Sequence, residues 1–287
     1  MSSKDNIMQN KCNLIGKEKS KQKSKLIKTY LILIWLSGAS LFCFQLISRY
    51  RTYHAAEQEY KDLNRNIWNN QFKSNLATPG EPTSDIPTMP PFPPNLSSSR
   101  SHLPPHLQLK KINPDYLFWL TIPGTAINYP VVRSPRPGYY LTHTFQKTEN
   151  PSGSLFIQED TPAPGNGNTV VFGHNMKDGT MFSDLKKYKD KNYYNDHAMI
   201  YLYYNERWYK ARIFSIQIRH ESNIDCYETE FHDQTQKQEF ITHMKKTSLY
   251  PTMFTPSDSD PIISLSTCYG RTERMIVQAS SLCYTDN

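Results

Sequence analysis

The sequence predicts a mainly β domain, a barrel or a sandwich, with one helix inserted between two late strands and one membrane-spanning helix ahead of the domain. Short β-type runs recur from about residue 108 onward. One stretch among them has helical spacing, and a long uncharged apolar run precedes the whole region. These three patterns define the expected architecture.

The predicted strands are rich in Val, Ile, Tyr, Phe and Trp and are separated by Gly, Pro, Asn and Asp. Side chains of the first group fit a half-buried pleated surface, whereas residues of the second group favour turns. The runs are Leu117–Ile122, Leu155–Ile157, Thr169–Phe172, Met199–Tyr203, Trp208–Ile218, Ile262–Ser266 and Met275–Ala279.

The stretch from His232 to Lys246 differs from these runs. It contains many helix-forming residues and places Phe240, Ile241 and Met244 on one helical face. It therefore predicts an amphipathic helix between the fifth and sixth of the predicted strands.

The apolar run from Thr29 to Ser48 is 20 residues long and carries no charge. At 1.5 Å per residue, a helix of this length spans about 30 Å, the thickness of a bilayer core. Eight lysines precede the run and Arg49 and Arg51 follow it, which favours a cytoplasmic N-terminus and an extracellular remainder. A cleaved signal peptide is the alternative, but its apolar region is usually only ~7–15 residues long.

Five regions follow from these patterns. Residues 1–28 form a basic cytoplasmic tail, and residues 29–48 form the transmembrane signal-anchor helix. Residues 49–75 lack Gly and Pro and place Tyr60, Leu63 and Ile67 on one stripe, and we interpret them as a solvated juxtamembrane helix. Residues 76–107 are rich in proline and predict an extended linker. Residues 108–287 form the folded outer domain.

The distribution of charge argues against a nucleic-acid-binding face. The chain carries a net charge of +7, and its first 28 residues alone, with eight lysines and two acidic residues, carry +6. The basic character therefore belongs to the tail and not to the folded domain.

Three of the five cysteines lie beyond the predicted membrane helix, at Cys226, Cys268 and Cys283. An odd number without a close pair predicts neither a disulfide framework nor a zinc motif. A bridge between Cys226 and Cys283 stays open. At least one outer cysteine is then free or paired with another chain.

The sharpest local motif is ISLSTCYGRTERMIVQA at residues 263–279. Cys268 ends a strand, a polar turn with Arg271 follows, and Arg274 opens the next strand. A nearby cation favours the thiolate, which is the reactive form of cysteine. The motif fits either a reactive thiol or a small buried hydrophobic residue.

A second motif, TVVFGHNMKDGTMF at residues 169–182, carries a strand into Gly173 and His174. A cysteine nucleophile needs such a partner to protonate a leaving amine and to deprotonate an incoming one. We interpret the other eight histidines as surface, spacer or linker residues.

Together these motifs resemble the sortase family of cysteine transpeptidases, and class B in particular. SLSTC at 264–268 is similar to the TLSTC-type signature, GHNM at 173–176 with MF at 181–182 is similar to the class B histidine segment, and RMIVQA at 274–279 is similar to the arginine strand. The segments Asn113–Val132, Tyr139–Leu141 and Gly153–Ile157 also fit, so the resemblance covers about residues 110–283. The helix predicted at 232–246 is a class B feature. No second membrane span follows in the 19 residues after Cys268, unlike class C.

The resemblance implies a sortase-type closed β-barrel with peripheral helices and an extracellular, membrane-anchored cysteine transpeptidase. In this family the equivalent of Cys268 is the nucleophile, that of His174 the acid and base, and that of Arg274 the cation on the oxyanion side. Arg271 is the alternative to Arg274. The substrate-binding residues expected from the motifs are Ser266, Thr267 and Asn175. No metal or organic cofactor is expected.

The resemblance also implies the partners. These are secreted proteins that bear a C-terminal sorting signal, an amine acceptor on a cell-wall precursor or a pilin, and the membrane through the N-terminal helix. A non-catalytic surface binding module on the same fold is one alternative. An L,D-transpeptidase is another, but its SxGC-type segment closely follows a histidine, whereas Cys268 lies 94 residues after His174.

Two features depart from the family pattern. The interval from Cys268 to Arg274 is short for class B, so that Arg271 lies in the same turn; the register of RMIV favours Arg274. Ser264 replaces the usual threonine of the signature but keeps its hydroxyl group.

Overall fold

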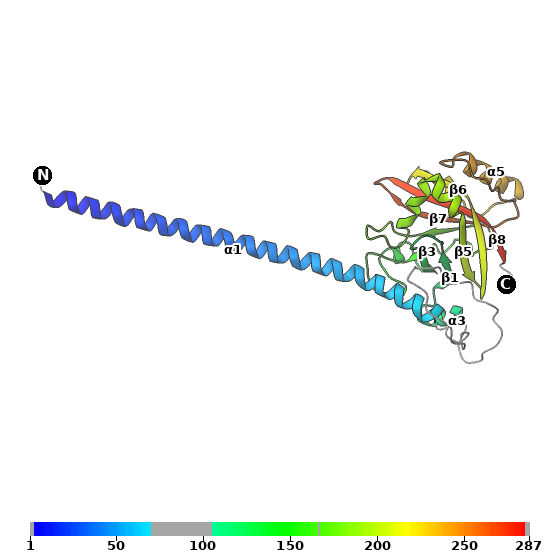
Figure 1. The fold of residues 1–287 in the computed structure, drawn as a ribbon, viewed down its shortest axis with the longest axis horizontal. Helices are drawn as coiled ribbons and strands as arrows, with labels where there is room; N and C mark the ends of the chain where they lie inside the picture. Colours follow the sequence, from blue (N-terminus) through cyan, green and yellow to red (C-terminus); the bar gives the residue numbers. More distant parts are fainter. Residues whose placement is uncertain (1–2, 70–104, 166, 285–287) are drawn as a thin grey trace, which may run out of the picture. The chain divides into compact units, whose positions relative to one another are not determined.

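The computed structural model describes residues 3–69, 105–165 and 167–284. The chain divides into two compact units, the first ending at Thr52 and the second starting at Tyr53. In the first unit the described backbone is entirely helical and belongs to α1 (Ser3–Asn64), whose last turns are part of the second unit (Figure 1).

Residues 29–48 are helical, but the membrane-spanning helix predicted there is not supported. Within the described ranges, no helix is both long enough and apolar enough to traverse a bilayer.

The second unit is built around a closed barrel in which the strand order is β1-β2-β3-β4-β7-β8-β6-β5. β2 pairs with β3 and β4 pairs with β7 in parallel, and all other neighbours are antiparallel. The strands are β1 (Tyr116–Thr121), β2 (Asn128–Arg133), β3 (Leu155–Ile157), β4 (Asn168–Phe172), β5 (Met199–Tyr204), β6 (Arg207–His220), β7 (Ile262–Tyr269) and β8 (Glu273–Tyr284). The barrel form of the prediction is thus confirmed. The strand-like runs of the sequence missed β2, which the family resemblance included.

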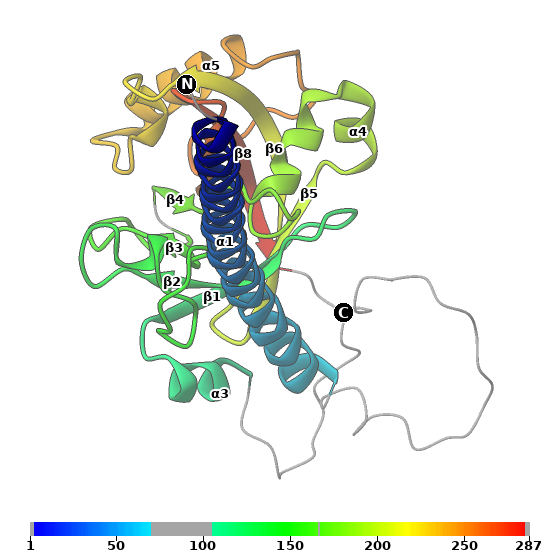
Figure 2. The ribbon, with the colours of Figure 1, turned by 90° about the vertical axis from the view of Figure 1, so that its left-hand side faces the viewer.

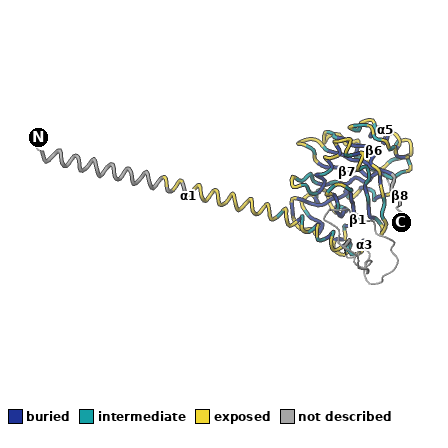
Figure 3. The backbone as a smooth tube through the Cα atoms, in the orientation of Figure 1, coloured by how far each residue is buried: buried dark blue, intermediate teal, exposed yellow. Residues whose placement is uncertain are grey.

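Helical segments precede β1 or lie in the connections between the strands. They are η1 (Arg65–Asn69), α3 (Pro105–Ile112), η2 (Tyr139–Leu141), η3 (Ser183–Lys189), α4 (Lys191–Asp196), η4 (Asp225–Tyr227) and α5 (Gln234–Lys246). Helices α3 and α5 lie on opposite sides of the second unit (Figure 2). The barrel strands are mostly buried, whereas the outer side of α5 is exposed (Figure 3).

Helix α5 confirms the inserted helix predicted over His232–Lys246. Asp233 caps it by accepting a hydrogen bond from the backbone N–H of Gln236. Its apolar face is buried against side chains of β6, β7 and β8, and the residues of this cluster are Phe214, Cys226, Phe240, Ile241, Met244, Ile262 and Ile276. The helix therefore covers the outer face of the strands that lead into and out of the Cys268 turn.

The end of α1 and the following η1 segment pack on the barrel instead of forming a solvated spacer. Tyr60, Leu63 and Ile67 are only 6%, 4% and 3% exposed and belong to the main core. The predicted apolar stripe was thus correct, but its solvated interpretation was wrong, because the barrel offers it an apolar partner surface. Residues 76–104, which are most of the predicted linker, lie outside the described residues, as do residues 70–75 of the predicted juxtamembrane helix. Helix α3 begins at Pro105, inside the range assigned to the linker and ahead of the predicted domain start.

Tyr60 fixes the end of α1 to the loop between β2 and β3. Its hydroxyl donates to the carbonyl oxygen of Gly153 at 2.8 Å and accepts from the backbone N–H of Phe145 at 3.2 Å. Burial raises its pKa far above the ordinary value, so the hydroxyl stays neutral. The loop that Tyr60 holds leads directly to Leu141, beside the candidate site.

We expect Tyr60→Phe to lower the free energy of unfolding by about 1–3 kcal/mol, because the substitution leaves two buried backbone groups without their partner. Urea unfolding of the full chain measures this loss. Tyr53→Phe, on the exposed side of the same helix, should stay within about 0.5 kcal/mol of the unmodified chain. Equal stability of the two variants would contradict the anchoring role of Tyr60.

Candidate active site

The parallel pairing of β4 with β7 brings the two chemical motifs of the sequence to one edge of the barrel. The register aligns Thr169 with Ile263 and Phe172 with Ser266. The carboxyl ends of parallel neighbours lie at the same edge of a sheet. His174, just beyond β4, and Cys268, near the end of β7, therefore emerge side by side although they are far apart in sequence.

Contacts on both sides of His174 join its segment to β7. The backbone N–H of Gly173 donates to the carbonyl oxygen of Ser266 at 3.2 Å, and the hydroxyl of Thr267 donates to the carbonyl oxygen of Gly173 at 2.8 Å. The side-chain amide of Asn175 donates to the carbonyl oxygen of Cys268 at 2.9 Å. The position of His174 along the barrel edge is thus set by its two neighbours.

Glycine is required at position 173 because the chain passes close to its surroundings. A Cβ atom there would come within 2.4 Å of Leu155 and 2.8 Å of Phe182. The imidazole Nε2 of the adjacent His174 lies 2.7 Å from the carbonyl oxygen of Leu141. Since a carbonyl oxygen can only accept, Nε2 carries a proton in this arrangement.

A tight β7–β8 hairpin brings an arginine to the thiol. The register pairs Cys268 with Arg274 and Tyr269 with Glu273, and Gly270 takes a positive φ of 68° in the turn. Arg274 Nη1 lies 2.7 Å from Cys268 Sγ. Arg271 is exposed in the turn itself. Of the two arginines considered from the sequence, Arg274 is the one that contacts the thiol.

A carboxylate that the sequence motifs did not include completes this group. Arg274 Nη2 donates to Oε2 of Glu221 at 3.1 Å. Glu221 follows β6, more than fifty positions before Arg274. No local motif could predict the pair, because only the β6–β8 pairing brings the two residues together.

The residues predicted to bind substrate lie in different surroundings. Ser266 and Thr267 are only 2% and 4% exposed. The Ser266 hydroxyl lies 2.8 Å from the hydroxyl of Tyr227, while that of Thr267 is bonded to Gly173. Asn175 is half-buried and holds the Cys268 backbone. In this structure the three residues fix the frame around Cys268 and His174.

Ser264, which departs from the family signature, also joins β7 to β4. Its hydroxyl donates to Oδ1 of Asn168 at 2.8 Å and accepts from the side-chain amide of Gln278 at 3.1 Å. All three side chains are fully buried. The hydroxyl that the substitution keeps is therefore used inside the barrel.

The other outer cysteine with a described side chain, Cys226, is a free thiol buried under α5. The possible Cys226–Cys283 bridge is therefore absent. Cys226 lies in the α5 cluster, whereas the backbone of Cys283 pairs with Lys210, near the start of β6. Burial raises the pKa of the Cys226 thiol to about 11. Cys268, by contrast, is exposed.

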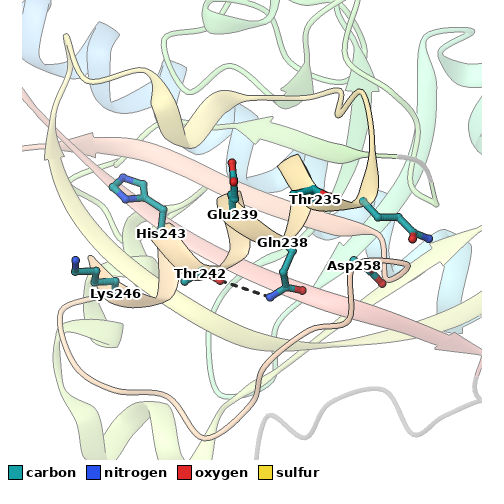
Figure 4. A pocket seen from close by; sticks show the side chains of 8 residues that line it. Thr235, Gln238, Glu239, Thr242, His243, Lys246 and Asp258 are labelled. Atoms are coloured by element: carbon teal, nitrogen blue, oxygen red, sulfur yellow. Dashed lines mark hydrogen bonds between the residues drawn. The ribbon is translucent and has the colours of Figure 1, made fainter.

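A separate hollow of about 610 Å³ runs along the outer side of α5 (Figure 4). It is lined by polar and charged side chains such as Gln238, Thr242, His243 and Asp258. None of the site residues described above lines it. In the part of the chain that the structure describes, no group of three or more His, Cys, Asp or Glu is arranged to hold a metal ion.

A closed barrel that presents a thiol, an imidazole and a guanidinium at one edge has the features of a cysteine enzyme of acyl transfer. Comparison with known proteins gives the family. A family model described as "Sortase domain" matches residues 120–282. Sortase B of Listeria monocytogenes is 36% identical over 177 residues, which is 59% of this chain and 71% of that protein.

Solved structures agree with this match. The X-ray structure of Clostridium perfringens sortase B aligns with a TM-score of 0.59 and 30% identity, covering 63% of this chain and 99% of that one. A crystal structure of sortase B complexed with triglycine aligns with a TM-score of 0.57 and 28% identity, covering 62% of this chain and 85% of that one. The chain belongs to the sortase family and is a sortase B-like cysteine transpeptidase. The L,D-transpeptidase alternative is thereby excluded.

We expect iodoacetamide to modify Cys268 and to spare Cys226 at about pH 8, because a thiol reacts as thiolate and Cys226 stays protonated far above that pH. Peptide mass spectrometry of the folded full chain identifies the modified residue. In urea both cysteines should react. Modification of Cys226 in the folded chain at a rate similar to that of Cys268 would contradict the buried, protonated state.

Proposed function

We propose that this enzyme cleaves a C-terminal sorting motif of secreted proteins and joins the protein to an amine, with Cys268 as the nucleophile. The observation that carries this proposal is the contact of Arg274 Nη1 with Cys268 Sγ at 2.7 Å, beside a histidine segment bonded to the same strand. Sortases act at the cell surface, and we assign this chain to that location. A relative solved with triglycine supports an amine acceptor.

The first half of the reaction forms a thioester. The Cys268 thiolate adds to the carbonyl carbon of the scissile peptide bond, and the carbonyl oxygen becomes an oxyanion. Arg274 stabilises this oxyanion with a fixed positive charge and N–H donors. The C–N bond then breaks, and His174 gives its proton to the departing amine.

The second half forms the new amide. An acceptor amine, on a cell-wall precursor or a pilin, adds to the thioester carbon, and His174 takes the proton that the amine loses. The oxyanion is again met by Arg274. The C–S bond breaks, the thiolate of Cys268 is regenerated, and the secreted protein is fixed to the envelope.

The first experiment is cleavage of fluorogenic peptides of the NPxTx-like and LPxTG-like types, with and without an amine acceptor. We use the full chain, because residues 53–67 belong to the packed unit. We expect cleavage, and a thioacyl adduct on Cys268 by mass spectrometry. Cys268→Ala should abolish both. A folded chain that yields neither product nor adduct with any peptide would overturn the proposal and favour a non-catalytic binding module on the same fold.

The two arginines give a matched pair of variants. We expect Arg274→Ala to lower kcat by about 100-fold or more, as the loss of an oxyanion donor does in other enzymes. Arg271→Ala, three positions away in the exposed turn, should change kcat by less than about twofold. Steady-state kinetics with the best peptide measures both effects. The reverse order of losses would assign the role to Arg271.

A further inference from the structure

The carboxylate of Glu221 lies at the rim of the site and contacts the arginine that contacts the thiol. Its side chain is 44% exposed, and that of Arg274 is 31% exposed. Glu221 Oε2 accepts from Nη2 of Arg274 at 3.1 Å, while Nη1 of the same guanidinium reaches Cys268 Sγ at 2.7 Å. The guanidinium thus lies between the thiol on one side and a carboxylate on the other.

The backbone fixes Glu221 relative to the hairpin that carries both other residues. Its N–H donates to the carbonyl oxygen of Thr272 at 2.8 Å, directly after the ladder pair of His220 with Glu273. The β6–β8 ladder therefore continues into the β7–β8 turn. Glu221 is attached to the same backbone frame as Cys268 and Arg274, although it follows another strand, β6.

Because the guanidinium is planar, the contact of Glu221 with Nη2 also affects the position of Nη1. The five N–H donors of the guanidinium form a rigid planar fork, so a partner on Nη2 also restricts where Nη1 can point. A partly exposed arginine without a second partner samples several rotamers. A carboxylate on Nη2 restricts that sampling and keeps Nη1 directed at the sulfur. The same carboxylate also offsets part of the positive charge of Arg274. This second effect weakens the action of the arginine on the thiol, whereas the restricted sampling strengthens it.

We propose that Glu221 is a positioning residue that holds Arg274 toward Cys268 and toward the oxyanion that forms there. The inference rests on the proposed role of Arg274. Positioning and charge offset predict opposite changes in the reactivity of Cys268 when the carboxylate is removed. If positioning dominates, loss of Glu221 makes Cys268 less reactive. If charge offset dominates, loss of Glu221 makes it more reactive.

Glu273 provides the matched control. It is the residue directly before Arg274 in β8, its side chain is exposed, and it carries the same charge. Its backbone pairs with Tyr269 and His220, and the described hydrogen bonds and ion pairs of Arg274 involve Glu221 and not Glu273. Glu273→Gln therefore removes a neighbouring negative charge without removing the contact.

The first test needs no substrate. We measure the rate at which iodoacetamide modifies Cys268 at about pH 7 in the full chain, followed by peptide mass spectrometry. We expect Glu221→Ala to slow this reaction several-fold, because loss of the carboxylate frees the guanidinium of Arg274 to turn away from the sulfur that it contacts. Glu273→Gln should leave the rate unchanged. In an Arg274→Ala background, Glu221→Ala should have no further effect, since coupled residues are not additive.

The second test uses turnover of the best sorting peptide. We expect Glu221→Ala to lower kcat by about tenfold, less than direct loss of an oxyanion donor, with KM within about twofold. Glu221→Gln keeps an acceptor oxygen and should retain more activity than Glu221→Ala. If all variants have equal thermal unfolding midpoints, a loss of kcat is not caused by a loss of folded protein.

Three outcomes would overturn the inference. These are faster alkylation of Cys268 in Glu221→Ala, an equal loss in the Arg274→Ala background, and an equal loss in Glu273→Gln. Absence of peptide cleavage by the unmodified chain would overturn the proposed function alone. The alkylation result would still decide whether Glu221 positions Arg274.

Discussion

The parallel pairing of β4 with β7 is the interaction on which the candidate site depends. It is in register from Asn168 opposite Ile262 to Phe172 opposite Ser266, and it is the reason why His174 and Cys268 lie at one edge. Side chains alternate between the two faces of a strand, so a slip of one residue would turn Cys268 to the other face. A parallel pair also needs a long connection. Here that connection includes β5, β6 and α5, and α5 then packs on the strands that it helps to join.

The segment that carries His174 is also supported from outside the barrel, by the end of α1. The end of α1 anchors the β2–β3 loop through Tyr60, and the same loop supplies the carbonyl oxygen of Leu141 to His174. Tyr60 also contacts Tyr129 edge to face, at 5.1 Å between ring centroids, and the Tyr129 hydroxyl accepts from the backbone N–H of Met181. Met181 is paired with Asn175, the residue after His174. The α1 segment therefore supports the histidine segment from two directions.

The features that sequence could predict are those with a local pattern. The β-type runs, the amphipathic spacing of Phe240, Ile241 and Met244, and the strand-ending Cys268 and His174 are all visible within a few residues. The sequence could not predict which distant surface or residue each of these elements contacts. The stripe of Tyr60 looked like that of a solvated helix because its apolar partner surface is distant in sequence. The apolar run near residue 40 suggested a bilayer span, which the helices among the described residues do not support. Glu221 carried no signal, since its importance arises only from the β6–β8 ladder.

The interval between Cys268 and Arg274 is shorter than the class pattern. It places the two residues directly opposite each other in the β7–β8 hairpin. Residues directly opposite each other on antiparallel strands have Cβ atoms about 4.5–5.5 Å apart. An arginine side chain is much longer than this gap, so Arg274 must bend back toward its own strand partner to bring Nη1 to the sulfur. A tight turn offers few groups that could hold a bent side chain in place. The carboxylate of Glu221 enters from β6, beyond the turn, and contacts the far nitrogen of the guanidinium. The short hairpin places Arg274 opposite Cys268, and Glu221, directly after β6, holds the guanidinium toward the thiol.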